Sequence, residues 1–305
     1  MKNFADKLIE EIKNKESYVV CGLDPIWESI PEGVKVRFKS KGAAIFAFNK
    51  AIIDAIHDVV VCVKPQLAYY EQYGINGLIA FKATVEYARK KGLLVIADGK
   101  RNDIGSTSLA YAKAYLSKGD ASDLAFDCDA LTVNPYLGWN GIQPFVEMCK
   151  QNSKGIFILV KTSNPSSGEL QDLIVEGGRT IYEKVAELVD KWGSELVGDS
   201  GYSSVGAVVG ATYPEQAERI RKIIPRSIIL VPGYGAQGGN AKSVVVNFND
   251  DGLGAVVNAS RSILYAYKSD RWSGAYDEDA YADAARAEAV YMRDEINMEL
   301  EKRQK

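Results

Sequence analysis

Eight short apolar segments alternate with helical patterns along this 305-residue chain, and that alternation limits the folds it can adopt. Each apolar segment has the length and composition of a buried strand, and apolar residues at helical spacing follow it. The expected strands lie within residues 17–25, 59–66, 92–100, 130–136, 155–164, 204–211, 227–237 and 254–262. Because repeated strand–helix units form parallel sheets and eight of them can close, the sequence predicts an α/β fold, a (β/α)8 TIM barrel.

Helical patterns also occupy the two ends of the chain, outside the eight units. Phe4, Leu8 and Ile12 recur every four residues, so the first helix has one apolar stripe and is suited to plugging the bottom of the barrel. Residues 281–305 are rich in Ala, Glu and Arg, which predicts one long C-terminal helix with a charged end. No linker or low-complexity tract divides the chain, so we expect residues 1–305 to form a single domain.

Composition narrows the functions open to the chain. The 37 basic and 40 acidic side chains leave a net charge of −3, so no overall field attracts nucleic acid or an anionic membrane. No apolar run approaches the roughly 20 residues of a membrane span, and the first segment resembles an amphipathic helix rather than a signal peptide, so we expect a cytoplasmic protein. Cys21, Cys62, Cys128 and Cys149 are expected to stay reduced, and the single histidine, His57, argues against a poly-histidine metal site or a Ser-His-Asp triad.

Polar residues collect where the expected strands end. In barrels of this class the carboxyl ends of the strands carry the chemistry, so side chains placed there without a packing reason are candidates for function. The candidates are Asp24 after the first strand, Lys64 after the second, Asp98 and Lys100 after the third, Lys161, Thr162 and Ser163 after the fifth, and Ser260 and Arg261 after the eighth. We expect all of them to converge on one mouth.

Asp98 and Lys100 are the centre of this set. They are two residues apart, and strand side chains alternate, so both should point into the barrel, while Asp103 lies beyond the strand. Charges inside an apolar barrel are costly unless they are paired, and Lys64, Asp98, Lys100 and Asp103 alternate in sign so that they can neutralise one another. The alternative is an ion-pair network that only closes the top of the barrel.

A second signal points to phosphate. The segment PGYGAQGGN, residues 232–240, is a glycine-rich turn at the start of an expected helix, and Arg261 follows the next strand. Barrels of this class commonly bind phosphate at this place. We expect the backbone amides of Gly235 to Gly239 and the side-chain amide of Gln237 to donate to phosphate oxygens, with Arg261 supplying a bidentate, charge-assisted pair.

These residues together resemble a known family, the orotidine 5'-phosphate decarboxylases, in its longer microbial branch. The matching motifs are CGLDP around Asp24, VKPQ around Lys64, DGKRNDIGST from Asp98, TSNP at Ser163, PGYGAQGG, and SRS at Arg261. The spacing D-x-K-x-x-D is shared with related sugar-phosphate barrel enzymes. The resemblance implies decarboxylation of orotidine 5'-monophosphate to uridine 5'-monophosphate without metal or cofactor, the last step of de novo pyrimidine synthesis.

The resemblance also implies a role for each matched residue. Asp24 and Lys64 would bind ribose hydroxyls, Ser163 would contact the pyrimidine, and Gln237 and Arg261 would hold the phosphate. Pro232 and Ser260 belong to the same substrate-binding set. A homodimer is implied in which Asp103, Ile104 and Thr107 reach into the neighbour's site. The loops at 25–42 and 194–205 look longer than in compact members, and their role is open.

Lys100 carries the mechanistic hypothesis. It would sit beside C6 of the pyrimidine, stabilise the carbanion left by CO₂ and then donate the proton, while Asp98 lies near the departing carboxylate and Asp103 of the partner orients both lysines. One rival is a sugar-phosphate enzyme that forms a metal-stabilised enediolate. A second is a Schiff-base aldolase with Lys161 or Lys64 as nucleophile, and a third is a phosphate sensor or inert scaffold.

Overall fold

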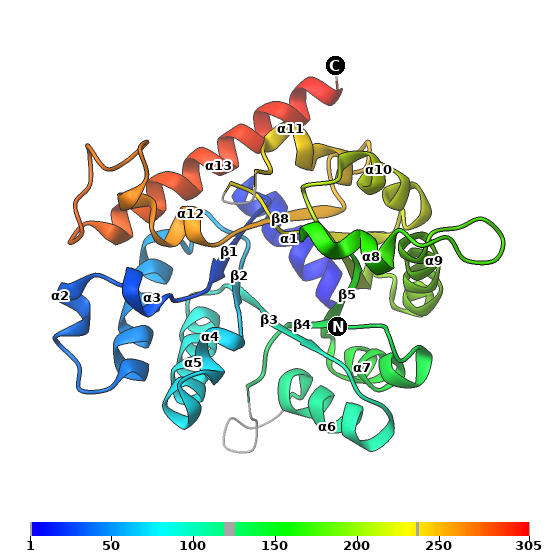
Figure 1. Cartoon of the computed structure of the whole chain (residues 1–305), viewed down its shortest axis with the longest axis horizontal. Coiled ribbons are helices and arrows are strands. Elements are labelled where there is room, and N and C mark those ends of the chain that lie inside the picture. The colour runs from blue at the N-terminus through cyan, green and yellow to red at the C-terminus, as the bar shows by residue number, and fades with distance from the viewer. Residues whose placement is uncertain (1, 119–125, 236–237, 305) are drawn as a thin grey trace.

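Eight parallel strands form a closed barrel in the computed structural model of the protein, which describes residues 2–118, 126–235 and 238–304 (Figure 1). The strands are β1 (Val19–Leu23), β2 (Cys62–Pro65), β3 (Leu94–Arg101), β4 (Ala130–Val133), β5 (Gly155–Lys161), β6 (Ser203–Val209), β7 (Ser227–Val231) and β8 (Ala255–Ala259). Each pairs with its neighbours in the chain, and β8 closes the ring on β1. All eight overlap the expected segments, so the predicted (β/α)8 barrel is confirmed, while the assignment of the whole chain to one domain stays a prediction.

Helices surround the barrel between successive strands (Figure 1). The longer ones are α3 (Lys41–Ile56), α5 (Gly74–Lys90), α6 (Gly105–Leu116), α7 (Trp139–Asn152), α9 (Ile181–Gly193), α10 (Pro214–Ile223) and α13 (Tyr281–Gln304), and each lies where apolar spacing predicts a helix. Five others have four residues each: α2 (Glu32–Lys35), α4 (Ala68–Glu71), α8 (Gly168–Gln171), α11 (Ala241–Val244) and α12 (Arg261–Leu264). A single turn is too short to show a helical period, so only α11 is expected from the sequence. The sequence predicts a helix over residues 240–249, which is longer than the observed α11.

The first helix, α1 (Phe4–Lys15), plugs the end of the barrel where the strands begin. Its apolar stripe is buried among residues from the barrel interior, in one cluster with Phe157 and Val256. Phe4 meets the ring of Phe157 edge-on, with ring centroids 5.9 Å apart, and covers Gly155 at the start of β5. Burial of each large apolar side chain contributes roughly 1.5–3 kcal/mol, so the plug is part of the stabilising core. The predicted plug is therefore confirmed.

The loop at 194–205 holds this plug in place. The Asp6 carboxylate on α1 accepts hydrogen bonds from the backbone N–H groups of Asp199 and Ser200, at 3.2 and 2.8 Å. The side-chain amide of Asn3 donates to the carbonyl of Leu196 at 3.0 Å. The loop lies at the opposite end of the barrel from the strand exits, so it has no contact with the expected reaction centre.

The loop at 25–42 is fastened to the segment that follows β8. The hydroxyl of Tyr265 accepts a hydrogen bond from the backbone N–H of Ile26 at 2.7 Å, and the hydroxyl of Tyr267 donates to the carbonyl of Ser29 at 3.0 Å. These contacts join the exits of β1 and β8, where the barrel closes. The loop therefore braces the rim beside Asp24.

The C-terminal helix α13 crosses the outside of the barrel and covers α3 and α11 (Figure 1). It presents small side chains to them, because Ala284, Ala285 and Ala289 are fully buried and allow close approach of the helices. Met292 and Ile296 continue the same buried face. The alanine-rich composition that predicts the helix also sets the side on which it packs.

The structure bears on the state of the cysteines and on the presence of membrane-spanning helices. All four cysteines are buried and unbridged, as predicted. Over the described residues, no helix combines the length and the apolar character required to cross a bilayer. The cytoplasmic location stays a prediction.

Candidate active site

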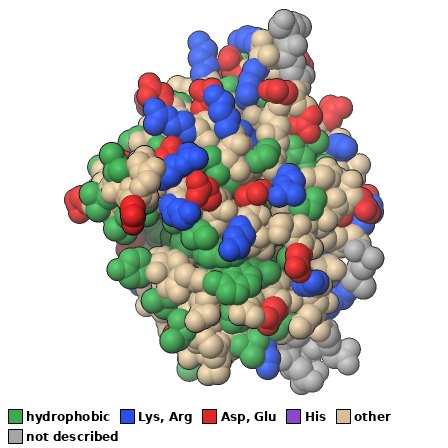
Figure 2. Space-filling model, turned by 90° about the vertical axis from the view of Figure 1, so that its right-hand side faces the viewer, with side chains coloured by type: hydrophobic (Ala, Val, Ile, Leu, Met, Phe, Trp, Pro, Cys, Tyr) green, Lys and Arg blue, Asp and Glu red, His purple; other side chains and the backbone are tan. Residues whose placement is uncertain are grey.

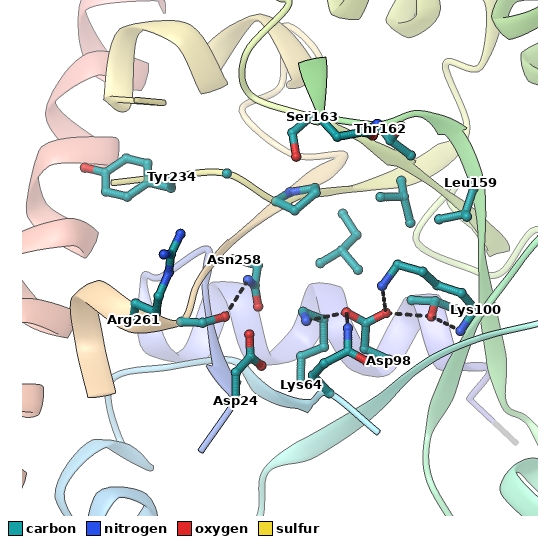
Figure 3. A pocket seen from close by; sticks show the side chains of 18 residues that line it. Asp24, Lys64, Asp98, Lys100, Leu159, Thr162, Ser163, Tyr234, Asn258 and Arg261 are labelled. Carbon is teal, nitrogen blue, oxygen red and sulfur yellow. Dashed lines mark hydrogen bonds and ion pairs between the residues drawn. The ribbon is translucent and has the colours of Figure 1, made fainter. Parts of the chain in front are cut away.

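A cavity of about 410 Å³ opens at the carboxyl ends of the strands (Figure 3). Side chains from all parts of the ring line it, and they include most of the residues predicted from the strand exits. The predicted residues that line it are Asp24, Lys64, Asp98, Lys100, Thr162, Ser163, Pro232, Ser260 and Arg261. The expected convergence on one mouth is therefore observed for eight of these, and Pro232, assigned by the resemblance, lines the same cavity.

A larger cavity, of about 650 Å³, lies on the outside of the barrel between α7 and α9. Figure 2 looks onto this side of the molecule and shows apolar side chains gathered in its lower half among scattered charges. Trp139, Leu188 and Trp192 line the groove, and none of the predicted site residues does. The smaller cavity at the strand ends is the candidate active site because it alone of the two holds the converging charges.

Asp98 is the hub of that cavity. Its Oδ2 accepts from Lys64 Nζ at 2.6 Å and from the Gln66 amide at 3.0 Å. Its Oδ1 accepts from Lys100 Nζ at 2.6 Å and from the Thr132 hydroxyl at 2.8 Å. Both carboxylate oxygens thus carry two hydrogen bonds each, so the side chain is fixed in one orientation, with a lysine on either side (Figure 3).

The environment keeps this network ionised. Burial of the Asp98 side chain, which is 9% exposed, acts to raise its pKa, but the charges and hydrogen bonds of Lys64 and Lys100 prevail and hold the pKa well below its usual range. Burial likewise acts to lower the pKa of Lys64, yet the nearby charges of Asp98 and Asp24 leave it raised. Lys64 is therefore a stable ammonium, and not an amine poised to lose its proton.

Lys100 reaches the cavity by a route that simple alternation does not describe. The pairing of β3 with β4 slips between Ala97 and Arg101, and Lys100 has φ of 45°, in the left-handed region. Its side chain is 44% exposed and points into the cavity toward Asp98. The prediction that both side chains face the interior is confirmed, although a bulge, rather than a regular strand, aims Lys100.

Asp24 and Asn258 present unpaired oxygens near the cavity. The Oδ1 atoms of both are buried and have no hydrogen-bond partner among the described residues. Burial raises the pKa of Asp24, opposed by the charge of Lys64 and a hydrogen bond with Ser260. Gly22 leaves room for the side chain of Ser260, because a Cβ at position 22 would lie 1.9 Å from Ser260 Oγ. Unpaired buried oxygens are costly, which favours a ligand that donates hydrogen bonds to them.

The glycine-rich turn differs from the expectation. The backbone N–H groups of Gly235, Gly238 and Gly239 donate to carbonyls within the turn, at 2.8, 2.9 and 3.1 Å. The prediction that this run of amides faces a phosphate is wrong for these three in the observed conformation, because the turn satisfies its own donors. Gln237 lies outside the described residues. Arg261 is exposed at the mouth and has no ion-pair partner within the described ranges, so its guanidinium remains open to an anion.

Four predicted residues do not line the cavity. Asp103, Ile104 and Thr107 follow β3 on the outer side, with Ile104 54% exposed and Thr107 also exposed. The fourth is Lys161, whose expected place at the mouth is wrong. Its ammonium is fully buried against Asp172 at 2.7 Å, because the β5–β6 pairing slips between Leu159 and Lys161 and turns the side chain out of the barrel.

Sequence reasoning missed four polar residues of the site: Gln66, Thr132, Asn164 and Asn258. Thr132 and Asn258 lie inside ordinary apolar strands, and nothing in the pattern separates them from packing residues. Gln66 stands in the quoted VKPQ motif two residues after Lys64, so strand alternation was a usable signal for it. Tyr234, expected to be a packing or rim residue, is almost wholly buried at the edge of the cavity.

Comparison with known proteins connects this geometry to a family. A family model described as the orotidine 5'-phosphate decarboxylase / HUMPS family matches residues 19–271. Orotidine 5'-phosphate decarboxylase from Rhodopirellula baltica is 47% identical over 301 residues, covering 97% of this chain and 99% of that one. The chain belongs to the orotidine 5'-phosphate decarboxylase family.

Further members agree along nearly the whole length. The orotidine 5'-phosphate decarboxylase from Caldicellulosiruptor saccharolyticus is 46% identical over 280 residues, covering 88% of this chain and 92% of that one. The solved OMP decarboxylase from Leishmania donovani is 31% identical with a TM-score of 0.71, covering 95% and 98% of the two chains. The similarity to these members therefore extends over most of the chain, and the resemblance drawn from the motifs is confirmed.

Proposed function

We propose that this member of the orotidine 5'-phosphate decarboxylase family converts orotidine 5'-monophosphate to uridine 5'-monophosphate and CO₂, with Lys100 as the catalytic acid. The observation that carries the proposal is the pair of lysines fixed on either side of one buried carboxylate at the mouth of the barrel. The reaction is the last step of de novo pyrimidine synthesis.

The chemistry needs a positive charge at one carbon. When the bond from C6 to the carboxylate breaks, its electron pair stays on C6, where the ring delocalises it poorly. An ammonium held beside C6 stabilises this charge more in the transition state than in the bound substrate, and its proton then passes to C6. Lys100 suits this role because its ammonium points into the cavity and is fixed by Asp98 at 2.6 Å.

Asp98 and Lys64 set the position of that ammonium. Asp98 is ionised and cannot give a proton to the carbanion, so it acts by orienting Lys100 and by lying near the departing carboxylate. Lys64 neutralises the second oxygen of Asp98 and keeps the hub charged in a desolvated place. Preorganised charges of this kind need no rearrangement during the reaction.

The remaining residues suit a nucleotide. The unpaired Oδ1 of Asp24 accepts from a ribose hydroxyl, Ser163 lies near the pyrimidine, and Arg261 pairs with the 5'-phosphate. Pro232 and Ser260 complete the walls between them. Gln237 is assigned to the phosphate by the family resemblance.

A homodimer belongs to the same proposal, with Asp103, Ile104 and Thr107 reaching into the neighbour's site. In support, these residues do not line their own cavity, and exposed apolar side chains lie beside them. Tyr136 is 76% and Leu137 45% exposed. A contiguous exposed apolar patch marks a site of contact with another protein.

The rival chemistries find less support. A Schiff-base nucleophile needs an amine with a lowered pKa inside the cavity, whereas Lys161 points out of it and the pKa of Lys64 is raised. A metal-stabilised enediolate needs several hard ligands, and the described residues contain no cluster of three or more acidic, His or Cys side chains suited to a metal ion. An inert scaffold leaves the complete charged network unexplained.

The decisive assay follows the loss of absorbance of orotidine 5'-monophosphate, with and without chelator. We expect turnover at the same rate in both, and no covalent adduct on borohydride treatment with substrate. If folded protein leaves the absorbance unchanged, the proposal is wrong. Activity lost on chelation would favour the metal-dependent rival instead.

A further inference from the structure

The backbone at Lys100 departs from the regular barrel. In the β3–β4 ladder Ile96 faces Ala130 and Ala97 faces Leu131, and the next matched pair is Arg101 with Val133. Between these pairs β3 has three residues, 98 to 100, where β4 has only Thr132. The strand therefore bulges at the residue that the mechanism depends on, and a bulge leaves backbone groups without ladder partners.

Thr132 supplies the missing partner. Its hydroxyl oxygen accepts a hydrogen bond from the backbone N–H of Lys100 at 2.9 Å. The same hydroxyl donates to Asp98 Oδ1 at 2.8 Å, the oxygen that also accepts from the Lys100 ammonium. These three hydrogen bonds form a closed ring that ties the Lys100 backbone, the Lys100 side chain and Asp98 together (Figure 3).

The ring holds a conformation that a lysine does not choose by itself. Lys100 has φ of 45°, where the side chain of an L-residue is crowded by its own backbone. Residues in such conformations persist when their surroundings over-determine them, and they concentrate at functional sites. Thr132 is 1% exposed, so water does not compete for its two hydrogen bonds.

Packing alone does not call for a hydroxyl at this position. Leu159, Val208 and Leu230 line the same cavity from β5, β6 and β7, and all are apolar. Valine has the shape of threonine and fits the same volume. What threonine adds is a hydroxyl, which donates to Asp98 and accepts from the Lys100 backbone N–H.

We infer that Thr132 is a positioning residue for decarboxylation, which sets the place of the Lys100 ammonium by replacing the strand hydrogen bond lost at the bulge. This inference rests on the proposed function of Lys100. Its two hydrogen bonds go to the Lys100 backbone and to Asp98, so it acts on the reaction through them. Its loss is felt in the rate of the chemical step and not in the affinity for the nucleotide.

The test compares Thr132→Val with Thr132→Ser. Thr132→Val keeps the volume and removes both hydrogen bonds, and we expect kcat to fall about tenfold or more while KM for orotidine 5'-monophosphate and binding of uridine 5'-monophosphate stay within about threefold. Thr132→Ser keeps the hydroxyl and is expected to retain most of kcat.

Thr84→Val is the matched control. Thr84 is fully buried, its hydroxyl accepts from the Asn49 amide at 3.1 Å, and it does not line the cavity. We expect this variant to lose thermal stability and to keep kcat, which separates the effect of removing a buried hydroxyl from the effect of displacing Lys100. If Thr132→Val does not fold, Thr132→Ala removes the same two hydrogen bonds and is measured against the same criterion.

Three outcomes would overturn the inference: Thr132→Val with normal kcat, Thr132→Ser as slow as Thr132→Val, or a crystal structure of Thr132→Val in which Lys100 keeps both its φ and its contact with Asp98. The structural readout does not need turnover. Inactive wild-type protein would therefore count against the proposed function, while an unmoved Lys100 would count against the role of Thr132.

Discussion

Asp98→Asn tests how strongly the hub is desolvated. The substitution keeps the shape of the side chain and removes its charge, which leaves the Lys64 ammonium buried with a weaker partner. Breaking a buried pair in this way costs about 3–5 kcal/mol of unfolding free energy. Asp24 also stabilises charged Lys64, and the half-exposed Lys100 keeps its hydration, so we expect the lower part of that range.

Loss of the Lys64 proton sets an upper limit on the cost in unfolding free energy. If burial forces Lys64 to become neutral, the cost at pH 7 is bounded by the 3.4 units between pH 7 and the ordinary lysine pKa of about 10.4, or about 4.6 kcal/mol. The estimate from pair breaking and this upper bound agree. We therefore expect a loss of about 3–4 kcal/mol at pH 7.

The pH dependence of stability that Lys64 causes has opposite signs in the wild type and in Asp98→Asn. In the wild type the raised pKa of Lys64 contributes stability that is present below about pH 10.4 and is lost as the pH rises through the folded-state pKa. The lowered pKa of Asp98 contributes stability that is present above about pH 3.9 and is lost as the pH falls. In Asp98→Asn the buried Lys64 binds its proton less tightly than the unfolded chain does, so stability rises from pH 7 toward pH 10.

Urea unfolding at pH 7, 8 and 9 measures both effects. Asp58→Asn is the control, because its ion pair with Arg286 lies at the surface and its loss should cost at most about 1 kcal/mol with no such pH trend. Two results would refute the desolvated network. One is a loss of unfolding free energy below about 1 kcal/mol for Asp98→Asn, and the other is a difference in unfolding free energy from the wild type that does not become smaller as the pH rises.

Three further substitutions separate chemistry, binding and folding. Lys100→Ala should lower kcat by about a thousandfold or more and still bind uridine 5'-monophosphate, and near-normal turnover would remove Lys100 from its role. Arg261→Ala should raise KM by about ten- to a hundredfold with a smaller change in kcat, as steady-state kinetics will show, and an unchanged KM would contradict phosphate binding there. Arg221→Met should cost about 3 kcal/mol in urea unfolding without loss of kcat, because Arg221 is 5% exposed and donates to four buried carbonyls, including those of Gly254 and Ser227 at 2.9 and 2.8 Å.

The barrel was predictable because each strand and each long helix carries its own periodic signal. The polar residues at the carboxyl ends of the strands then locate the site, since these ends all lie on one face of the barrel. For Asp24, Lys64 and Asp98 this reasoning suffices. Asp24 and Lys64 leave strands whose pairing is regular, and Asp98, at the start of the slip in β3, still faces the cavity.

Prediction fails where the ladder slips. The slip in β5 turns Lys161 outward, and the slip in β3 leaves Lys100 facing the cavity in a strained conformation. Alternation treats the two lysines alike, and only the pairing of neighbouring strands separates them. The glycine turn fails for a similar reason, since whether its amides face a ligand or one another depends on a fold of the turn that composition does not determine.

The plug formed by α1 gives the chain an unusual order of assembly. Helix α1 precedes the barrel in the chain, but its burial site is complete only when β8, more than two hundred residues later, has been synthesised and paired. Until then the stripe of Phe4, Leu8 and Ile12 stays exposed, and long-range contacts of this kind slow folding because a large loop must close before they form. Helix α1 is thus made before the barrel strands and is among the last elements to be buried, so protection of α1 indicates that the barrel is complete.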